Sequence, residues 1–154
     1  MKKRALVLLI ILSVVLVSFS VFVFVRYDFE NTNKQEANIS NNSVLEVIDG
    51  DTFKLGNGEI VRLICVDAPE KGKQGYEEAK EFLSFLILNK EVRLEKDVSD
   101  KDEYGRALRY VYVKDVYVRE IFVNKEVVRE GYAGVFRYGE DTSKCREIEG
   151  TLVG

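Results

Sequence analysis

The chain has 154 residues, no histidine, two cysteines and a formal net charge of −3. Its length suits one compact domain with an additional segment. Because histidine is absent, mechanisms that need a histidine base or a histidine metal ligand are excluded. Two cysteines match no metal-binding spacing and are too few for a disulfide scaffold. Cys65 lies in an apolar run, so it is expected to be a small residue of the core.

Residues 5–25 are apolar apart from serines, and a charge-free helix of this length can span a bilayer. Residues 2–4 are all basic, against the single Arg26 on the other side, so the positive-inside rule places the N-terminus in the cytoplasm and the rest outside. A signal peptide cleaved near residues 18–20 is the alternative and would give a secreted protein. The apolar run continues past that site, which favours an uncleaved membrane anchor.

Residues 26–43 are polar, rich in asparagine and without apolar periodicity, as is typical of a solvated linker. The folded domain is therefore expected at residues 44–154. It contains 18 Lys and Arg against 23 Asp and Glu, which makes its formal net charge −5. A domain with this charge does not attract polyanions through its overall field.

Five β-type runs and an intervening helix are predicted in this domain. The first three runs are separated by glycine-containing turns and predict an antiparallel meander over residues 44–48, 52–55 and 59–66. Between Tyr76 and Leu88 the apolar residues recur at helical spacing, which predicts a helix packed on the sheet. Two further strands are expected at residues 91–95 and 107–113.

The run 116–123 is typical either of a further hairpin arm or of the approach to a helix. Asn124 is expected to cap a short helix over residues 125–130, with Gly131 as its C-terminal stop. Five short strands, one helix between them and another after them predict a mainly β (α+β) fold, a five-stranded Greek-key barrel with packed helices. Barrels of this kind bind oligonucleotides among other ligands.

The residues suited to chemistry are carboxylates and arginines at the ends of predicted strands: Asp51, Arg62, Asp67, Glu70 and Arg106. Since the second and third strands are hairpin neighbours, Asp51 and Asp67 are expected to lie together, and two such carboxylates suit Ca²⁺. Pro69 fixes the chain after the third strand, so Glu70 can point beyond the metal. A carboxylate base and two arginines around a hard cation suit phosphodiester cleavage, because the arginines would bind charge that accumulates on the phosphoryl oxygens.

One geometric condition follows from the spacing of these residues. Arg62 and Asp67 are five positions apart, so in a regular strand their side chains would point to opposite faces. If both serve one site, a bulge or a sharp bend must lie between them, and it is expected near residues 64–66.

Several motifs occur in a characteristic order: VIDGDTFKL, VRLICVDAPE, GYEEAKEFL, DEYGRALRYVYV and FVNKEVVREGYA. In order and spacing they resemble the staphylococcal nuclease (thermonuclease) family across residues 44 to about 138. The resemblance implies an OB-fold barrel with helices, an endonuclease that hydrolyses DNA and RNA with low sequence specificity. It also implies dependence on Ca²⁺ and products with 3′-phosphate ends. No protein partner is implied, and a monomer is expected.

The resemblance also implies roles for individual residues. Asp51 and Asp67 are similar to the calcium carboxylates, and Ala68 would supply a carbonyl oxygen to the ion. Glu70 is similar to the base that activates water, and Arg62 and Arg106 to the pair that binds phosphate. Tyr104 is similar to a tyrosine that contacts a substrate phosphate. Tyr138 could stack on a base, although packing in the sheet is the default interpretation for the tyrosines of this region.

Three features depart from the family type. The link over residues 71–75 is short, the domain is acidic where the family is basic, and residues 141–154 offer at most a short helix. A missing C-terminal helix would expose apolar barrel surface and lower stability. Two alternatives therefore stay open, an OB-fold module that binds nucleic acid without catalysis and a shortened, unstable chain.

Overall fold

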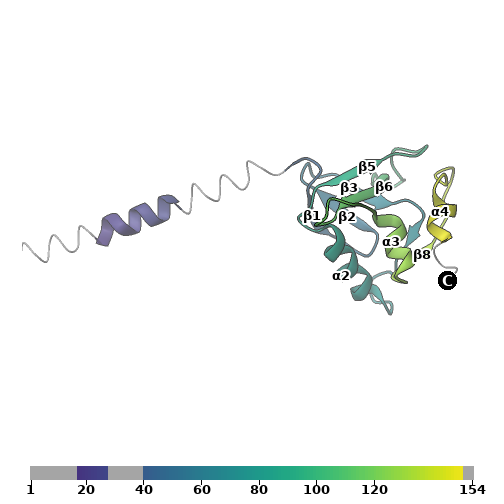
Figure 1. The fold of residues 1–154 in the computed structure, drawn as a ribbon, viewed down its shortest axis with the longest axis horizontal. Coiled ribbons are helices and arrows are strands. Elements are labelled where there is room, and N and C mark those ends of the chain that lie inside the picture. Colours follow the sequence, from purple (N-terminus) through teal and green to yellow (C-terminus); the bar gives the residue numbers. More distant parts are fainter. Residues whose placement is uncertain (1–16, 28–39, 151–154) are drawn as a thin grey trace, which may run out of the picture. The chain divides into compact units, whose positions relative to one another are not determined.

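The computed structural model describes residues 17–27 and 40–150 (Figure 1). Residues 17–27 form a helix, and Ser40 begins a separate unit that contains the sheet. Within these two ranges, no helix is both long enough and apolar enough to cross a membrane. Most of the predicted anchor and most of the predicted linker lie outside the described residues, so both stay predictions.

A three-stranded meander opens the domain, as predicted. Its strands β1 (Val44–Val47), β2 (Thr52–Leu55) and β3 (Ile60–Leu63) pair antiparallel in chain order. β3 pairs in parallel with β6 (Ala107–Lys114), and β6 pairs antiparallel with β5 (Val92–Glu95). The resulting strand order, β1-β2-β3-β6-β5, makes a mixed sheet.

The run after residue 115, which the sequence left ambiguous, contributes a further strand. β7 (Glu120–Phe122) pairs antiparallel with the end of β6, so the sheet has one strand more than predicted. A separate ladder joins β4 (Val66–Asp67) to β8 (Gly134–Val135). The predicted mixed α+β fold is confirmed, because strands and helices alternate in one domain around this mixed sheet (Figure 1).

In residues 40–150 three helices accompany the strands: α2 (Tyr76–Ile87), α3 (Val123–Arg129) and α4 (Cys145–Glu149). α2 is the helix predicted from apolar spacing and ends one residue earlier than expected. Its buried residues are Ala79, Leu83, Leu86 and Ile87, which recur at the period of a helix face. The same core contains Phe53, Leu63 and Val127, which are buried.

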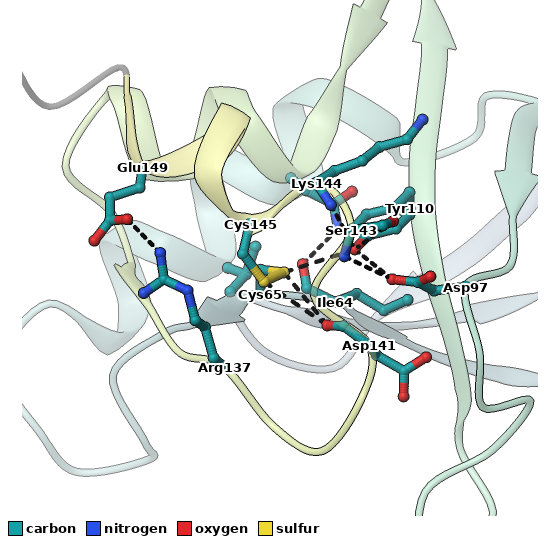
Figure 2. Close-up of a disulfide and its surroundings, with 12 residues drawn as sticks. Ile64, Cys65, Asp97, Tyr110, Arg137, Asp141, Ser143, Lys144, Cys145 and Glu149 are labelled. Carbon is teal, nitrogen blue, oxygen red and sulfur yellow. Dashed lines mark hydrogen bonds and ion pairs between the residues drawn. A yellow bond between two sulfur atoms is a disulfide. The ribbon is translucent and has the colours of Figure 1, made fainter.

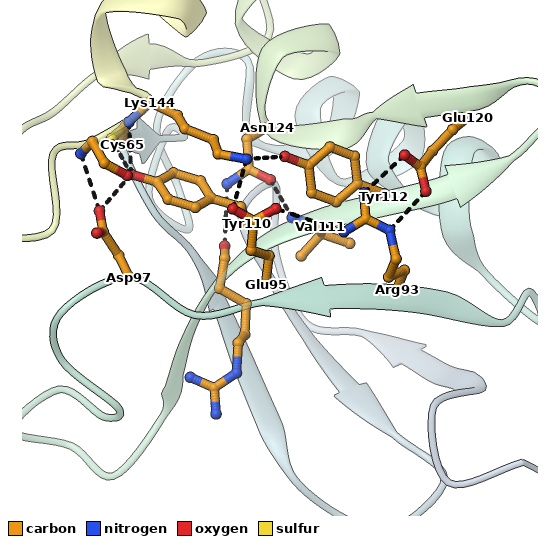
Figure 3. Close-up of polar contacts among 12 residues, drawn as sticks. Cys65, Arg93, Glu95, Asp97, Tyr110, Val111, Tyr112, Glu120, Asn124 and Lys144 are labelled. Carbon is orange, nitrogen blue, oxygen red and sulfur yellow. Dashed lines mark hydrogen bonds and ion pairs between the residues drawn. The ribbon is translucent and has the colours of Figure 1, made fainter.

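The predicted role of Asn124 as a helix cap is wrong. α3 begins at Val123, so Asn124 lies inside its first turn and is fully buried. Its side-chain oxygen accepts a hydrogen bond from the Val111 amide (2.8 Å) (Figure 3). Its amide group donates to the carbonyl oxygens of Ile64 (2.9 Å) and Arg109 (3.2 Å). Buried backbone groups need such partners. Asn124 therefore fastens α3 to β6 and to the residue after β3.

Cys65 is buried in the core, as predicted, but the sequence did not predict that it is paired. It forms a disulfide with Cys145, 80 positions later in the chain (Figure 2). Cys145 is the first residue of α4, and Ile148 in the same helix is fully buried. The short C-terminal helix that the sequence predicted is thus present and covalently held to the segment between β3 and β4.

Polar contacts hold the residues just before α4 against the sheet. The Asp97 carboxylate accepts hydrogen bonds from the Tyr110 hydroxyl (2.8 Å) and the Ser143 amide (3.0 Å) (Figure 2). The Lys144 ammonium lies 2.6 Å from the Glu95 carboxylate (Figure 3). Together with the disulfide, these contacts position the segment that connects β8 to α4. This segment forms one wall of the candidate active site.

Candidate active site

The turn between β1 and β2 directs Asp51 toward the interior. The Asp51 amide donates a hydrogen bond to the Asp49 carboxylate (3.1 Å), which shapes the turn. At Gly50, an added Cβ would lie 2.6 Å from the Cβ of Ala79 and 2.7 Å from the Cβ of Ala68. Since real Cβ atoms do not approach so closely, the close packing of α2 on this turn requires glycine.

Asp51 is 5% exposed, and both oxygens of its carboxylate have polar partners. One oxygen accepts a hydrogen bond from the Thr52 hydroxyl (2.9 Å), and the other accepts from the Ala68 amide (2.8 Å) and lies 2.9 Å from Nη1 of Arg62. Burial raises the pKa of Asp51 to about 7, against the opposing effects of Arg62 and the Ala68 amide. In the absence of a further cation, this carboxylate holds its proton unusually tightly.

A sharp bend separates β3 from β4, as the spacing of Arg62 and Asp67 requires. Residues 64–65 form a turn, and Cys65 has a φ of +61°, in the left-handed region. The Arg62 guanidinium donates a hydrogen bond to the carbonyl oxygen of Val66 (2.6 Å), and its Nη2 lies 3.4 Å from Oδ1 of Asp67. The bend therefore brings Arg62 and Asp67 to one side of the chain, and the prediction of a bend at this place is confirmed.

Arg106 is positioned by Asp102, a residue that the sequence analysis did not single out. The Asp102 carboxylate accepts hydrogen bonds from Nε of Arg106 (2.6 Å) and from the amides of Tyr104 (3.0 Å) and Arg106 (2.9 Å). Partial burial acts to raise the pKa of Asp102, but these hydrogen bonds outweigh it and lower the pKa. An aspartate three residues before Gly105 is typical of a side-chain-stabilised turn, and this signal could have identified Asp102.

The two arginines lie on the wall of one cavity of about 190 Å³. Tyr104 and Tyr138, both exposed, line the same cavity, as does Phe136, which no sequence pattern indicated. The Arg106 guanidinium carbon lies 5.3 Å from the centre of the Tyr104 ring. A charged and aromatic surface of this kind suits a ligand that carries both phosphate and a ring.

Glu70 has no side-chain contact with this cluster among the contacts of the described residues. It is exposed on the segment after β4, and its carbonyl oxygen accepts a hydrogen bond from the Lys73 amide. Among the residues that line the cavity, Glu70 is absent. Direct contacts thus bring together Asp51, Arg62 and Asp67. The two tyrosines and the two arginines share one cavity. In the part of the chain that the structure describes, the Glu70 side chain contacts none of them.

The donor chemistry of the cluster fits a hard cation. Asp51 and Asp67 both contact the Arg62 guanidinium, which brings two carboxylates to the same side chain. Carboxylate oxygens are the ligands that Ca²⁺ prefers, with carbonyl oxygens and water completing its shell. In the described part of the chain, no group of three or more acidic, cysteine or histidine side chains is gathered for a metal. Two carboxylates are therefore the side-chain ligands that the site offers.

Several known proteins are similar in sequence to this chain. The family described as Staphylococcal nuclease homologue matches residues 60–150. A thermonuclease of Staphylococcus hyicus is 36% identical over 158 residues, which cover 97% of this chain and 90% of the relative. A thermonuclease of Staphylococcus intermedius is 44% identical over 58% of this chain and 56% of the relative.

Endonuclease YncB of Bacillus subtilis is 34% identical over 65% of this chain and 52% of the relative. The chain thus spans about half the length of YncB and of the Staphylococcus intermedius protein, and most of the length of the Staphylococcus hyicus protein. The match of the family across more than half of the chain, together with the near full-length similarity to one relative, shows that this protein belongs to the staphylococcal nuclease family.

Proposed function

We propose that the protein is a Ca²⁺-dependent nuclease that hydrolyses phosphodiester bonds in DNA and RNA with low sequence specificity and leaves 3′-phosphate ends. The observation that carries the proposal is the position of Arg62, which contacts the carboxylates of Asp51 and Asp67 and also lines the cavity that contains Arg106. A phosphate in that cavity would meet both arginines beside carboxylates suited to a hard cation. The two thermonucleases and the endonuclease among the relatives support the same activity.

Asp51 and Asp67 would hold the ion, and the carbonyl group of Ala68 would provide a further oxygen. Ca²⁺ at this place would supply positive charge that polarises a phosphate oxygen. The Thr52 hydroxyl and the Ala68 amide fix the orientation of the Asp51 carboxylate through hydrogen bonds of 2.9 and 2.8 Å. This ligand is therefore oriented by the fold before any ion binds.

Glu70 would act as the general base. Its exposed carboxylate follows Pro69 in the segment after β4, and it would take a proton from an attacking water molecule. Arg62 and Arg106 would bind the charge that develops on the phosphoryl oxygens. Asp102 contacts Arg106 through Nε, so the two terminal nitrogens of Arg106 can face a phosphate.

Tyr104 and Tyr138 would complete the substrate site. Both rings are exposed and line the same cavity as the arginines. Tyr104 would contact a substrate phosphate, and Tyr138 would stack on a base, an interaction that tolerates any sequence because every base has a π-face. We assign this site to an OB-type barrel over residues 44–154, acting as a monomer.

Residues 5–25 would anchor the protein in a membrane as a single span, with the catalytic domain outside the cell. If this segment is instead cleaved as a signal peptide, the domain would be secreted. The disulfide between Cys65 and Cys145 supports either location, because disulfides form and persist in oxidising compartments outside the cytoplasm.

Cleavage of single-stranded DNA by the purified full chain tests this function. Activity is expected with Ca²⁺ and is expected to disappear with excess chelator. Glu70→Gln removes the base and should lower kcat by about 10²- to 10⁴-fold. Glu78→Gln, which changes an exposed carboxylate in the first turn of α2, serves as the matched control and should leave kcat within twofold, about the noise of such assays.

Two results would contradict the proposal. Cleavage that continues unchanged in chelator would remove the metal from the mechanism. No cleavage by a protein with a cooperative thermal transition would remove the enzymatic function itself and leave a module that binds nucleic acid without catalysis.

A further inference from the structure

The connection between β6 and β7, residues 115–119, carries three large apolar side chains at its tip. Val116, Tyr117 and Val118 are 91%, 76% and 70% exposed. Single exposed apolar residues are common, but three in succession at the end of a hairpin form a projecting apolar surface. We call residues 116–118 the apolar tip.

Hydrogen bonds inside the connection fix the conformation of the apolar tip. The Asp115 carboxylate accepts hydrogen bonds from the amides of Tyr117 (2.9 Å) and Arg119 (2.8 Å) and pairs with the Arg119 guanidinium (2.8 Å). Val118 has a φ of +62°, which is strained for a β-branched residue. Strained backbone of this kind is retained where the surrounding structure imposes it, often at sites that bind something. The hydrogen bonds of Asp115 hold the three apolar side chains together and outward.

The apolar tip lies at the end of the domain where the polypeptide arrives from the N-terminal segment. The Ser40 hydroxyl donates a hydrogen bond to the Glu91 carboxylate (2.9 Å), and the Asn42 carbonyl oxygen accepts one from the Val92 amide (3.1 Å). Val92 is paired with Val113, near the end of β6 from which the connection to β7 extends. The first residues of the domain therefore lie on one side of β5, and the base of this hairpin lies on the other.

The candidate active site lies at the other end of the same strand. Arg106 immediately precedes Ala107, the first residue of β6, whereas Lys114 is its last residue. Eight residues of extended strand span about 25 Å. A surface bound by the apolar tip would therefore leave the arginines and their cavity facing away from it.

We propose that the apolar tip inserts into the interface of the bilayer in which residues 5–25 would be anchored. The proposal goes beyond the nuclease activity, and its choice of partner rests on the proposed anchor. Tyrosine is enriched at membrane–water interfaces, where its ring lies at headgroup depth. Lys114, which is exposed beside the tip, would meet anionic lipid headgroups, whereas the charge of Arg119 is balanced by Asp115. A tether and a tip at one end of the domain would together present the opposite, catalytic end to soluble nucleic acid.

The experiment uses a tryptophan at the tip, because the chain contains no tryptophan of its own. The full-length Tyr117→Trp protein is reconstituted into vesicles of phosphatidylcholine and phosphatidylglycerol, with and without bromine on the acyl chains. The matched control is Tyr104→Trp, since Tyr104 has 77% exposure, nearly that of Tyr117, and lies by the start of β6. Insertion to the depth of about 5 to 10 Å typical of interfacial segments should shift the emission of the tip tryptophan to shorter wavelength and quench it about twofold, with little change in the control.

A second variant makes the result specific to the apolar surface. Val116→Asp in the Tyr117→Trp background should reduce the quenching to the level of the control. Equal quenching of the two tryptophans would overturn the proposal. A blue shift at the tip without quenching by brominated lipid would also overturn it, by indicating that a second copy of the chain covers the tip. Failure of the reconstituted chain to float with vesicles would also overturn it, while its nuclease activity in detergent would still report separately on the proposed function.

Discussion

Asp51 is a buried carboxylate that pairs with Arg62 and accepts a hydrogen bond from the Ala68 amide. Burial outweighs these favourable contacts and raises its pKa to about 7. The metal-free carboxyl therefore keeps its proton to a higher pH than an ordinary aspartate does. The proton and a cation compete for the same oxygens, so the stability of the free domain and its affinity for metal both depend on pH near neutrality.

The pH dependence of stability tests this account of Asp51. Because its pKa in the folded state lies above the ordinary value of 3.8, the stabilisation by the neutral form is fully present below about pH 4 and is lost as the pH rises through about 7. In chelator, the free energy of unfolding of the wild type should fall over this range relative to that of Asp51→Asn, whose side chain does not titrate. Parallel profiles for the two proteins, measured by denaturant unfolding, would show that burial does not perturb this carboxyl.

α2 packs closely on the turn between β1 and β2, and this contact positions the proposed metal ligands. Gly50 in the turn, Ala79 in α2 and Ala68 after β4 approach so closely that an added Cβ at residue 50 would overlap both alanines. The turn carries Asp51, and Ala68 follows Asp67 directly. One small-residue contact therefore sets the separation of both proposed ligand segments, and α2 acts as the support behind them.

Gly50→Ala should destabilise the domain by about 1 to 3 kcal/mol, the usual range for overpacking a close contact. Ala79→Gly removes the nearest of the two overlapping groups, so the double variant should be less destabilised than the sum of the two single variants. Chemical denaturation of the four proteins in such a cycle measures the coupling. If the changes in unfolding free energy are strictly additive, residues 50 and 79 are not in close steric contact.

At the scale of the whole domain, residues 40–150, contacts join the segment around α4 to β5, to β6 and to the bend after β3. The disulfide joins α4 to the bend between β3 and β4, and Asp97 and Lys144 hold the preceding residues against β5 and β6. Phe136 and Tyr138, which line the cavity, lie in the segment between β8 and α4. The long-range closure of the fold and the wall of the substrate cavity therefore depend on the same segment.

Removal of the disulfide with Cys65→Ser and Cys145→Ser should lower the free energy of unfolding by about 4 kcal/mol, because the bond closes a loop of 80 residues. The KM for DNA should rise as well, since one wall of the cavity loses its covalent attachment. Reductant should reproduce the loss of stability in the wild type and have no effect on the double variant. If the reduced wild type keeps its full stability, buried contacts such as that of Ile148 hold α4 without the disulfide.

Much of the local structure could be predicted because it depends on neighbours in the sequence. Glycine-containing turns between short apolar runs are sufficient to predict the meander, and the spacing of Ala79, Leu83 and Leu86 is sufficient to predict α2. The side-chain period of a strand required a bend between Arg62 and Asp67, and the structure has a turn at residues 64–65. The ordered motifs that resemble the staphylococcal nuclease family were likewise enough to predict the family.

Other features were decided only by tertiary packing. Asparagine favours helix caps, yet Asn124 is inside α3 because the backbone groups of Ile64, Arg109 and Val111 need a buried partner. Nothing local to Cys65 or Cys145 indicates that their Cα atoms lie 5.4 Å apart. By itself, the sequence determined the strands of the meander, the first long helix, the bend and the family, since each depends on residues close together in the chain. The disulfide, the partners of Asn124 and the cavity shared by the two arginines depend on how distant elements pack, and only the tertiary structure decided them.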